Sequence, residues 1–237
     1  MSIQFDKVQP KNKEQLKSLI EYTFNHNIYD LNFIDTSKIT DMSWLFVNVK
    51  HNFDISSWDV SNVTDMNHMF YDCDNFNCDL SKWNVSKVVN MFSTFSSCKK
   101  FKGKGLENWD VSAVTDMHYM FYECENLNCD LSDWNVSNVT NMWHLFDGCK
   151  KLDCDLSDWN VSKVKDMTSM FNGCKNFNCN LSHWNMSKVR NISYMFYNCT
   201  SFKGEGLYMW DASNIDDAIK TFKGCNKLTI PDWYKNI

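Results

Sequence analysis

The chain has 237 residues, of which 43% are hydrophobic and 15% aromatic, and its formal net charge is −5. This composition is sufficient for a continuous hydrophobic core, and the length alone allows one or two globular domains. The negative balance and the lack of a run of five or more basic residues argue against a phosphate-neutralising surface, so we expect no nucleic-acid partner.

The start of the chain, MSIQFDKVQPKNKEQ, lacks the apolar core of a signal peptide and has no lipid-attachment cysteine. No part of the chain approaches the roughly 20 consecutive apolar residues that a membrane-spanning helix requires. As written, the sequence predicts a cytoplasmic or otherwise intracellular protein without membrane insertion. A surface location is the alternative if a leader has been removed.

Residues 1–33 differ in pattern from the rest of the chain. Asn12 is followed three residues later by Gln15, which is the spacing of a capping box. The apolar residues from Leu16 to Phe24 then recur at helical spacing. We expect a helix from about 12 to 24 that covers the open end of a repeat stack, so that residues 1–33 form an N-terminal helical cap.

Beyond this segment the sequence repeats one unit, and seven tryptophans mark its copies. The steps between them are 25, 26, 25, 25, 25 and 26 residues. A period in the twenties is typical of a stacked-repeat protein, in which each unit contacts mainly its neighbours. We expect a tryptophan ladder in a dry interior, formed by Trp58, Trp83, Trp109, Trp134, Trp159, Trp184 and Trp210.

The apolar spacing changes within each unit. From Met142 to Cys149 the apolar residues lie at i, i+3, i+4 and i+7, which predicts a two-turn helix capped by the preceding Asn141. Leu152–Leu156 alternates apolar and polar residues, which predicts a short strand. The sequence therefore predicts an α/β repeat: a right-handed solenoid of about eight strand–helix turns, similar in outline to leucine-rich repeats.

This solenoid is expected over residues 34–226, followed by a C-terminal cap over 227–237. Two of its units are one residue longer and carry Gly103-Lys104-Gly105 and Gly204-Glu205-Gly206. Glycine within a strand often marks a bulge or a close backbone approach, and we predict a bulge at each site.

The same strand alternation turns a set of polar residues outward, which we name the polar stripe. Like charges stacked on neighbouring strands repel, so the aspartates need compensation. Hydrogen bonds to turn amides, a basic partner and calcium are three explanations that the sequence leaves open. The members are Asn77, Asp79, Asn128, Asp130, Asp153, Asp155, Asn178 and Asn180.

Eleven cysteines occupy only two positions of the unit. Cysteines at fixed repeat positions behave as small apolar residues, and an odd total fits full oxidation poorly. Zinc is the alternative, but a column spreads like residues along an axis instead of converging four ligands. We therefore expect reduced, buried thiols and no metal or other cofactor. The inner set is Cys73, Cys98, Cys124, Cys149, Cys174, Cys199 and Cys225, and the second set is Cys78, Cys129, Cys154 and Cys179.

The recurring serine, for example Ser137, has no repeating histidine nearby to serve as its base, so we expect no enzyme. Tyr119, Trp143 and Tyr194 fall at outward positions of the predicted helices. Together with the polar stripe, they are the candidate binding residues.

The unit, WNVSNVTNM..LF..C..L.CDLSDW, resembles the 25-residue repeat of BspA-like proteins from about Ile34 to Trp233. That repeat is known from bacterial surface antigens and mycoplasma-type lipoproteins. The resemblance implies a leucine-rich-repeat-like solenoid and, for function, adhesion or protein binding, and the family brings no catalytic residues to carry over.

The expected function is thus a non-enzymatic protein-interaction or adhesion module that presents a solenoid surface to a protein partner of unknown identity. One alternative is a structural protein that self-assembles. Another is a metal-dependent protein with its site at a cap or at a glycine bulge.

Overall fold

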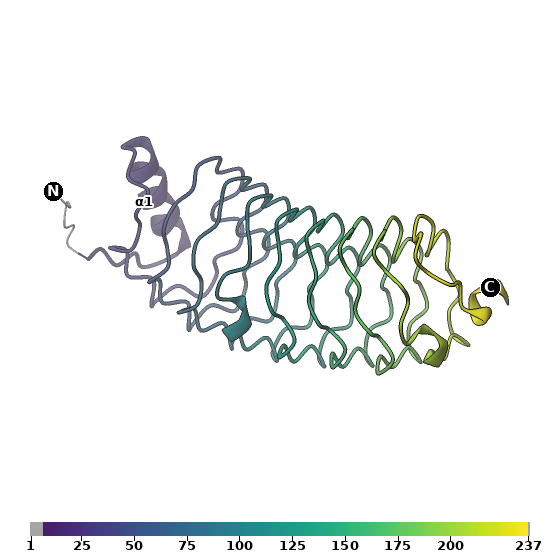
Figure 1. The fold of residues 1–237 in the computed structure, drawn as a ribbon. Helices are drawn as coiled ribbons and strands as arrows, with labels where there is room; N and C mark the ends of the chain where they lie inside the picture. The colour runs from purple at the N-terminus through teal and green to yellow at the C-terminus, as the bar shows by residue number, and fades with distance from the viewer. Residues whose placement is uncertain (1–6, 237) are drawn as a thin grey trace.

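A computed structural model of the chain describes residues 7–236. These residues form an elongated coil whose turns stack along one axis, with the two ends of the chain at opposite ends of the coil (Figure 1). Helix α1 (Lys13–Asn25) stands beside the first turns. Residues 1–6 of the predicted N-terminal cap and residue 237 of the predicted C-terminal cap lie outside the described range.

Helix α1 begins where the sequence places it. Asn12 is its N-cap, and the Asn12 side chain accepts a hydrogen bond from the amide of Gln15 at 3.0 Å. The Gln15 side chain in turn accepts from the amide of Lys11 at 2.9 Å, one residue before the position expected for a capping box. Leu16 and Ile20 lie on the inner face of the helix and are buried.

Parallel pairing joins each turn to the next on one side of the coil. Each contact is an isolated bridge rather than part of a longer strand. Pairing also joins Val8 to Ile34 and Asp30 to Asp54, so the segment before the solenoid takes part in it. The eight successive bridge positions within residues 7–236 are Asp41, Asp65, Asn90, Asp116, Asn141, Asp166, Asn191 and Asp217.

The repeating helix predicted from Met142 to Cys149 is wrong. His144 and Gly148 have left-handed backbones, with φ of 54° and 79°, and such residues interrupt an α-helix. The amides of Leu145 and Cys149 close tight turns by donating to the carbonyls three residues back. Two linked turns keep the same apolar residues facing inward that a helix would, which explains the misleading spacing.

The alternate amides of this segment bind the next turn. Those of Met142 and His144 donate to the carbonyls of Asp166 and Thr168 at 3.3 and 2.9 Å. Asn141, predicted as a helix cap, instead forms the parallel bridge, and its side chain accepts the amide two residues on at 3.1 Å. The face predicted as helical is therefore the one that carries the inter-turn ladder.

The strand predicted over 152–156 is also wrong, because no extended strand occurs within residues 7–236. Its alternation is nonetheless correct: Leu152 and Leu156 are buried, while Asp153 and Asp155 are exposed. The fold is a repeat solenoid, as predicted, but its turns are built from tight turns and single bridges.

The longer units contain short 3₁₀ helices in place of the predicted bulges. These are η1 (Leu106–Asn108) and η2 (Leu207–Met209), and both lie along the lower edge in the view of Figure 1. The preceding Gly105 has φ of 96°, and a Cβ there would lie 2.1 Å from the amide nitrogen of Ser81. The extra residue is absorbed by the helical turn, and the glycine permits the close backbone approach.

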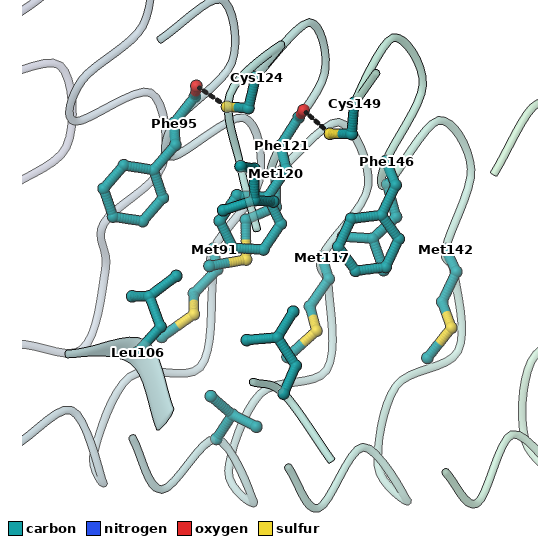
Figure 2. Close-up of a cluster of buried hydrophobic side chains, with 14 of the residues drawn as sticks. Met91, Phe95, Leu106, Met117, Met120, Phe121, Cys124, Met142, Phe146 and Cys149 are labelled. Atoms are coloured by element: carbon teal, nitrogen blue, oxygen red, sulfur yellow. Dashed lines mark hydrogen bonds between the residues drawn. The ribbon is translucent and has the colours of Figure 1, made fainter. Parts of the chain in front are cut away.

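Phenylalanine and tryptophan columns fill the interior. The rings of Phe121 and Phe146 lie 5.6 Å apart with planes 4° from parallel, and Figure 2 shows the phenylalanine column beside a methionine column. The indoles of Trp134 and Trp159 are 6.4 Å apart and parallel within 1°. Such rings contribute most of the burial energy of a thin repeat.

All eleven cysteines are free thiols. Each inner thiol donates to the carbonyl of a phenylalanine in the preceding turn, as Cys149 does to Phe121 at 3.0 Å (Figure 2). Burial raises the pKa of Cys73 to about 12. The inner cysteines therefore stay protonated and act as hydrogen-bonded core residues.

The last segment packs over the final turn. It ends in η3 (Asp232–Asn236), and the Trp233 indole stacks 6.1 Å from that of Trp210. The Tyr234 hydroxyl donates to the carbonyl of Ala218 at 3.0 Å. The tryptophan ladder thus continues one step beyond the repeats marked in the sequence.

Candidate functional site

The polar stripe lies on the surface, and its side-chain oxygens bind backbone amides. Asp155 accepts the amide of Ser157 at 3.0 Å, and Asp130 accepts that of Ser132 at the same distance. Asn128 reaches across to the next turn and accepts the amide of Asp153 at 3.1 Å. These are Asx turns and inter-turn links, so the hydrogen-bonding explanation of the stripe is observed.

Four further members of the stripe follow the same two patterns, and Asp153 takes part through its backbone amide. Asp79 and Asn180 accept the amides of Ser81 and Ser182. Asn77 and Asn178 accept amides of the following turn. The Lys104 ammonium bonds the Asp79 carboxylate at 2.6 Å and, with the Ser81 bonds, lowers the pKa of Asp79 to about 2.

One shallow groove crosses the stripe. It has a volume of about 460 Å³ and is lined by Asp153, Asp155, Cys179 and His183 among others. The Cys179 thiol contacts the Asp155 carboxylate at 3.3 Å, and burial raises the Cys179 pKa to about 12. Across residues 7–236, no group of three or more histidine, cysteine or acidic side chains could hold a metal ion.

A second surface, which we name the aromatic row, runs beside the bridge positions and crosses five turns. It consists of Trp44, His68, Phe92, His118 and Trp143. Trp44 stacks on His68 at 3.8 Å, and Phe92 stacks on His118 at 4.0 Å. His118 lies 6.2 Å from Trp143, with the two rings parallel within 6°. Desolvation lowers the pKa of His68 in this row.

The row joins a cluster of rings that we name the tyrosine cluster: Tyr119, Tyr122, Trp143 and His144. Tyr119 lies 5.4 Å from both Tyr122 and Trp143, and it stacks on His144 at 4.6 Å. The His144 ring also hydrogen-bonds the Asp147 carboxylate, with Nδ1 and Oδ2 2.6 Å apart. The cluster thus combines four rings from two turns with an acidic group.

Burial and nearby carboxylates perturb the two tyrosines of the cluster. Desolvation followed by the charge of Asp147 raises the pKa of Tyr119. Desolvation followed by the charge of Glu123 raises the pKa of Tyr122. Both phenols therefore sit in an acidic, partly dry environment.

Tyr194 occupies the same repeat position three units further on. Its ring has the Lys220 ammonium over it, 5.6 Å from the ring centre. The neighbouring Tyr197 receives the ammonium of Lys223 at 6.0 Å. These are cation–π contacts between consecutive turns.

The structure therefore brings Tyr119 and Trp143 together, whereas Tyr194 and the polar stripe lie elsewhere. Sequence reasoning missed Trp44, Phe92 and Tyr122, which complete the aromatic surface. Aligning the units on the buried Met42, Met91 and Met117, and then reading the residues one, two and five positions later, would have identified these rings. The assumed helix obscured this signal, because in a helix adjacent positions point in different directions.

No helix within residues 7–236 has the length and hydropathy needed to cross a bilayer. No curated protein sequence matches the chain significantly. The crystal structure of a TLR13–ssRNA13 complex aligns with 94% of this chain and 30% of its own, at 15% identity and a TM-score of 0.30. A similarity at this TM-score indicates nothing about the function of this chain, and the solenoid architecture follows from its own inter-turn hydrogen bonds.

The sequence also matches a protein family. The family described as "Mycoplasma protein of unknown function, DUF285" matches in three overlapping segments, at residues 14–134, 91–207 and 115–233. These segments include the aromatic row, the tyrosine cluster and the polar stripe. Because they cover nearly the whole chain, this protein belongs to the DUF285 family.

Proposed function

We propose that the chain is a non-enzymatic protein-interaction module of the BspA-like kind, which presents its outward residues to a protein partner. The observation that carries the proposal is a contrast between neighbouring positions. The buried position of the ladder segment holds methionine in most turns, as at Met117 and Met142. One residue later, the outward position changes from turn to turn, as from His118 to Trp143 to Thr168.

This contrast has a physical basis. Stacking restricts an inward column to residues of one shape, since each side chain packs on its copies above and below. An outward column is free of that restriction, so its residues are available for recognition. Large exposed aromatic side chains are also typical of the energetic centres of protein interfaces.

The site chemistry supports binding more than catalysis. The polar stripe uses its oxygens to hold turns, and the groove across it is shallow. Raised pKa values leave the thiols protonated, which suppresses their nucleophilicity. A metal-dependent function would need converging ligands, and it has no comparable support.

The proposal is tested by comparing three immobilised baits in lysate of the source organism. One is the wild type, one carries Tyr119→Ser with Trp143→Ser, and one carries Asp130→Asn with Asp155→Asn. The last pair retains the turn bonds, because asparagine accepts the same amides. We expect at least one protein to be enriched with the wild type and lost with one variant, at equal thermal stability of the baits.

An identical set of bound proteins on all three baits would contradict the proposal. Light scattering over a wide concentration range addresses the structural alternative. A mass that rises with concentration, and falls again in an outward-face variant, would favour self-assembly instead.

A further inference from the structure

We propose that the tyrosine cluster, with the carboxylates of Glu123 and Asp147, binds an arginine side chain of a partner protein. This inference rests on the proposed function and adds to it the place of binding and the chemistry of the partner. Two places in the solenoid share one repeat position and differ in the charges that the following turn supplies.

The first place shows that this position receives cations. Tyr194 and Tyr197 lie in the turn before the last one of the solenoid, and the last turn places Lys220 and Lys223 over their rings. The outward geometry of two tyrosines three residues apart therefore accommodates ammonium groups without further adjustment. Here the chain supplies its own cations.

At the second place, the tyrosine pair is the same but the following turn is different. Tyr119 and Tyr122 correspond to Tyr194 and Tyr197, three units earlier in the sequence. The residues that correspond to the two lysines are His144 and Asp147. A carboxylate thus stands where an ammonium stands in the later turn, and Glu123 adds a second carboxylate beside Tyr122.

The local charge favours a cationic ligand. Between Asp116 and Cys149 the sequence contains no lysine or arginine, whereas it contains Glu123 and Asp147. Lys99, which interacts electrostatically with Glu123, forms an ion pair with Asp74 at 3.0 Å. A basic partner would therefore complement a surface whose acidic charge is only partly offset by the chain itself.

An accessible indole completes the site. Trp143 is 37% exposed and lies 5.4 Å from both Tyr119 and His144. Its counterpart in the next turn is Thr168, which is too small to stack on the indole as His68 stacks on Trp44. One side of the indole is thus left without an aromatic neighbour from the following turn.

These features favour arginine over lysine. A guanidinium can stack on an indole while its N–H groups bond a carboxylate in two-point fashion, which an ammonium cannot do. Tryptophan is also the strongest cation–π partner among the aromatic side chains. The site is therefore matched to an arginine-bearing segment.

The test uses short fluorescent Gly/Ser peptides that carry two arginines, two lysines or two citrullines, titrated against the purified full chain by anisotropy. Citrulline has nearly the shape of arginine but no charge. We expect the arginine peptide to bind more tightly than the lysine peptide and the citrulline peptide to bind at least about tenfold more weakly than the arginine peptide. Trp143→Ala, or Glu123→Gln with Asp147→Asn, should weaken the arginine peptide by a similar factor.

The matched control is Asp133→Asn with Asp158→Asn, which removes two exposed carboxylates outside both candidate surfaces and should leave binding unchanged. Equal binding of the arginine and citrulline peptides would overturn the inference. An equal loss of binding in the control would do so as well, since it would indicate nonspecific attraction to an acidic protein. A partner captured by the wild-type bait but retained after Glu123→Gln with Asp147→Asn would leave the proposed function standing and reject this site.

Discussion

The indole nitrogen of Trp134 donates a hydrogen bond to the carbonyl oxygen of Leu106 in the preceding turn, with the two atoms 2.8 Å apart. The bond satisfies a donor that would otherwise be buried without a partner. It also makes each tryptophan a link between turns as well as a core residue. The same link, at 2.8 to 3.3 Å, is made by Trp58, Trp83, Trp109, Trp159, Trp184, Trp210 and Trp233.

Two substitutions at Trp134 separate these roles. Trp134→Phe keeps a ring but leaves the Leu106 carbonyl without its indole donor, so we expect a loss of about 1–3 kcal/mol in the free energy of unfolding. Trp134→Ala also removes the ring and should cost about 3–5 kcal/mol. Urea denaturation of both variants measures the difference. A Trp134→Phe protein as stable as the wild type would show that the hydrogen bond contributes nothing.

Glycine substitutions distinguish a left-handed position where a Cβ would meet another backbone from one where a Cβ has room. Gly105→Ala meets both a positive φ and the Ser81 backbone at 2.1 Å, and we expect it to destabilise the protein by more than about 3 kcal/mol. Gly173→Ala has the φ penalty alone, because its nearest neighbour is 3.8 Å away, so it should cost about 1–2 kcal/mol.

Gly173→Asn is the control for the second site. Asn198 and Ser97 occupy the same repeat position with φ near 60°, at 58° and 61°. The asparagine variant should therefore be less destabilised than the alanine variant, since asparagine tolerates this conformation. Thermal unfolding of the three variants ranks them, and a Gly105→Ala protein as stable as Gly173→Asn would refute the close approach.

The buried thiols predict a loss of stability in alkaline solution. Burial raises the pKa of Cys73 from 9.0 to about 12. Between these values the unfolded chain releases the thiol proton while the folded chain keeps it, so the free energy of unfolding falls as the pH rises. Denaturation of the wild type and of Cys73→Ala across this pH range separates the contribution of the Cys73 thiol from that of tyrosine and lysine titration. If the free energy of unfolding depended on pH identically in the two proteins, a contribution from the Cys73 thiol would be excluded.

In acid, the Asx turns predict the opposite pH dependence, in which the free energy of unfolding falls as the pH falls. Hydrogen bonds from the Ser112 hydroxyl and amide hold the pKa of Asp110 below its ordinary value of 3.8. This contribution is present above 3.8 and is lost as the pH falls through the folded-state pKa. Asp110→Asn should keep the turn, because Asn84 and Asn135 accept the same amide at 3.1 Å in other units.

The comparison for Asp110→Asn is its stability relative to wild type at neutral pH and below pH 3.8. We expect the variant to gain on the wild type as the pH decreases. A constant difference between the two proteins would show that the Asp110 carboxylate is not linked to folding.

The repeat period and the inward residues were predictable from the sequence because both depend on side-chain chemistry. Trp134, Phe146 and Leu156 are apolar at fixed spacing and are buried as expected. The backbone between them was not predictable, since i, i+3, i+4 and i+7 spacing suits both a helix and two linked turns. His144 and Tyr119 occupy left-handed positions without being glycine, so their residue types gave no signal of a break.

The binding surface was only partly predictable for a related reason. Tyr119, Trp143 and Tyr194 are conspicuous as large outward residues, and all three carry exposed or half-buried rings. Contacts such as that of Lys220 with Tyr194 join residues one turn apart, and they depend on the inter-turn register. The register follows from the backbone hydrogen bonds between successive turns. The sequence predicted a helix in the segment that forms these bonds, so the register could not be derived.

Hydrogen exchange of the ten indole N–H groups tests the separation of inward and outward positions most directly. The structure predicts slow exchange for the eight hydrogen-bonded indoles and fast exchange for Trp44 and Trp143, whose side chains are 49% and 37% exposed. Fast exchange throughout, or protection of Trp143 in the free protein, would contradict a stacked interior with an open aromatic surface.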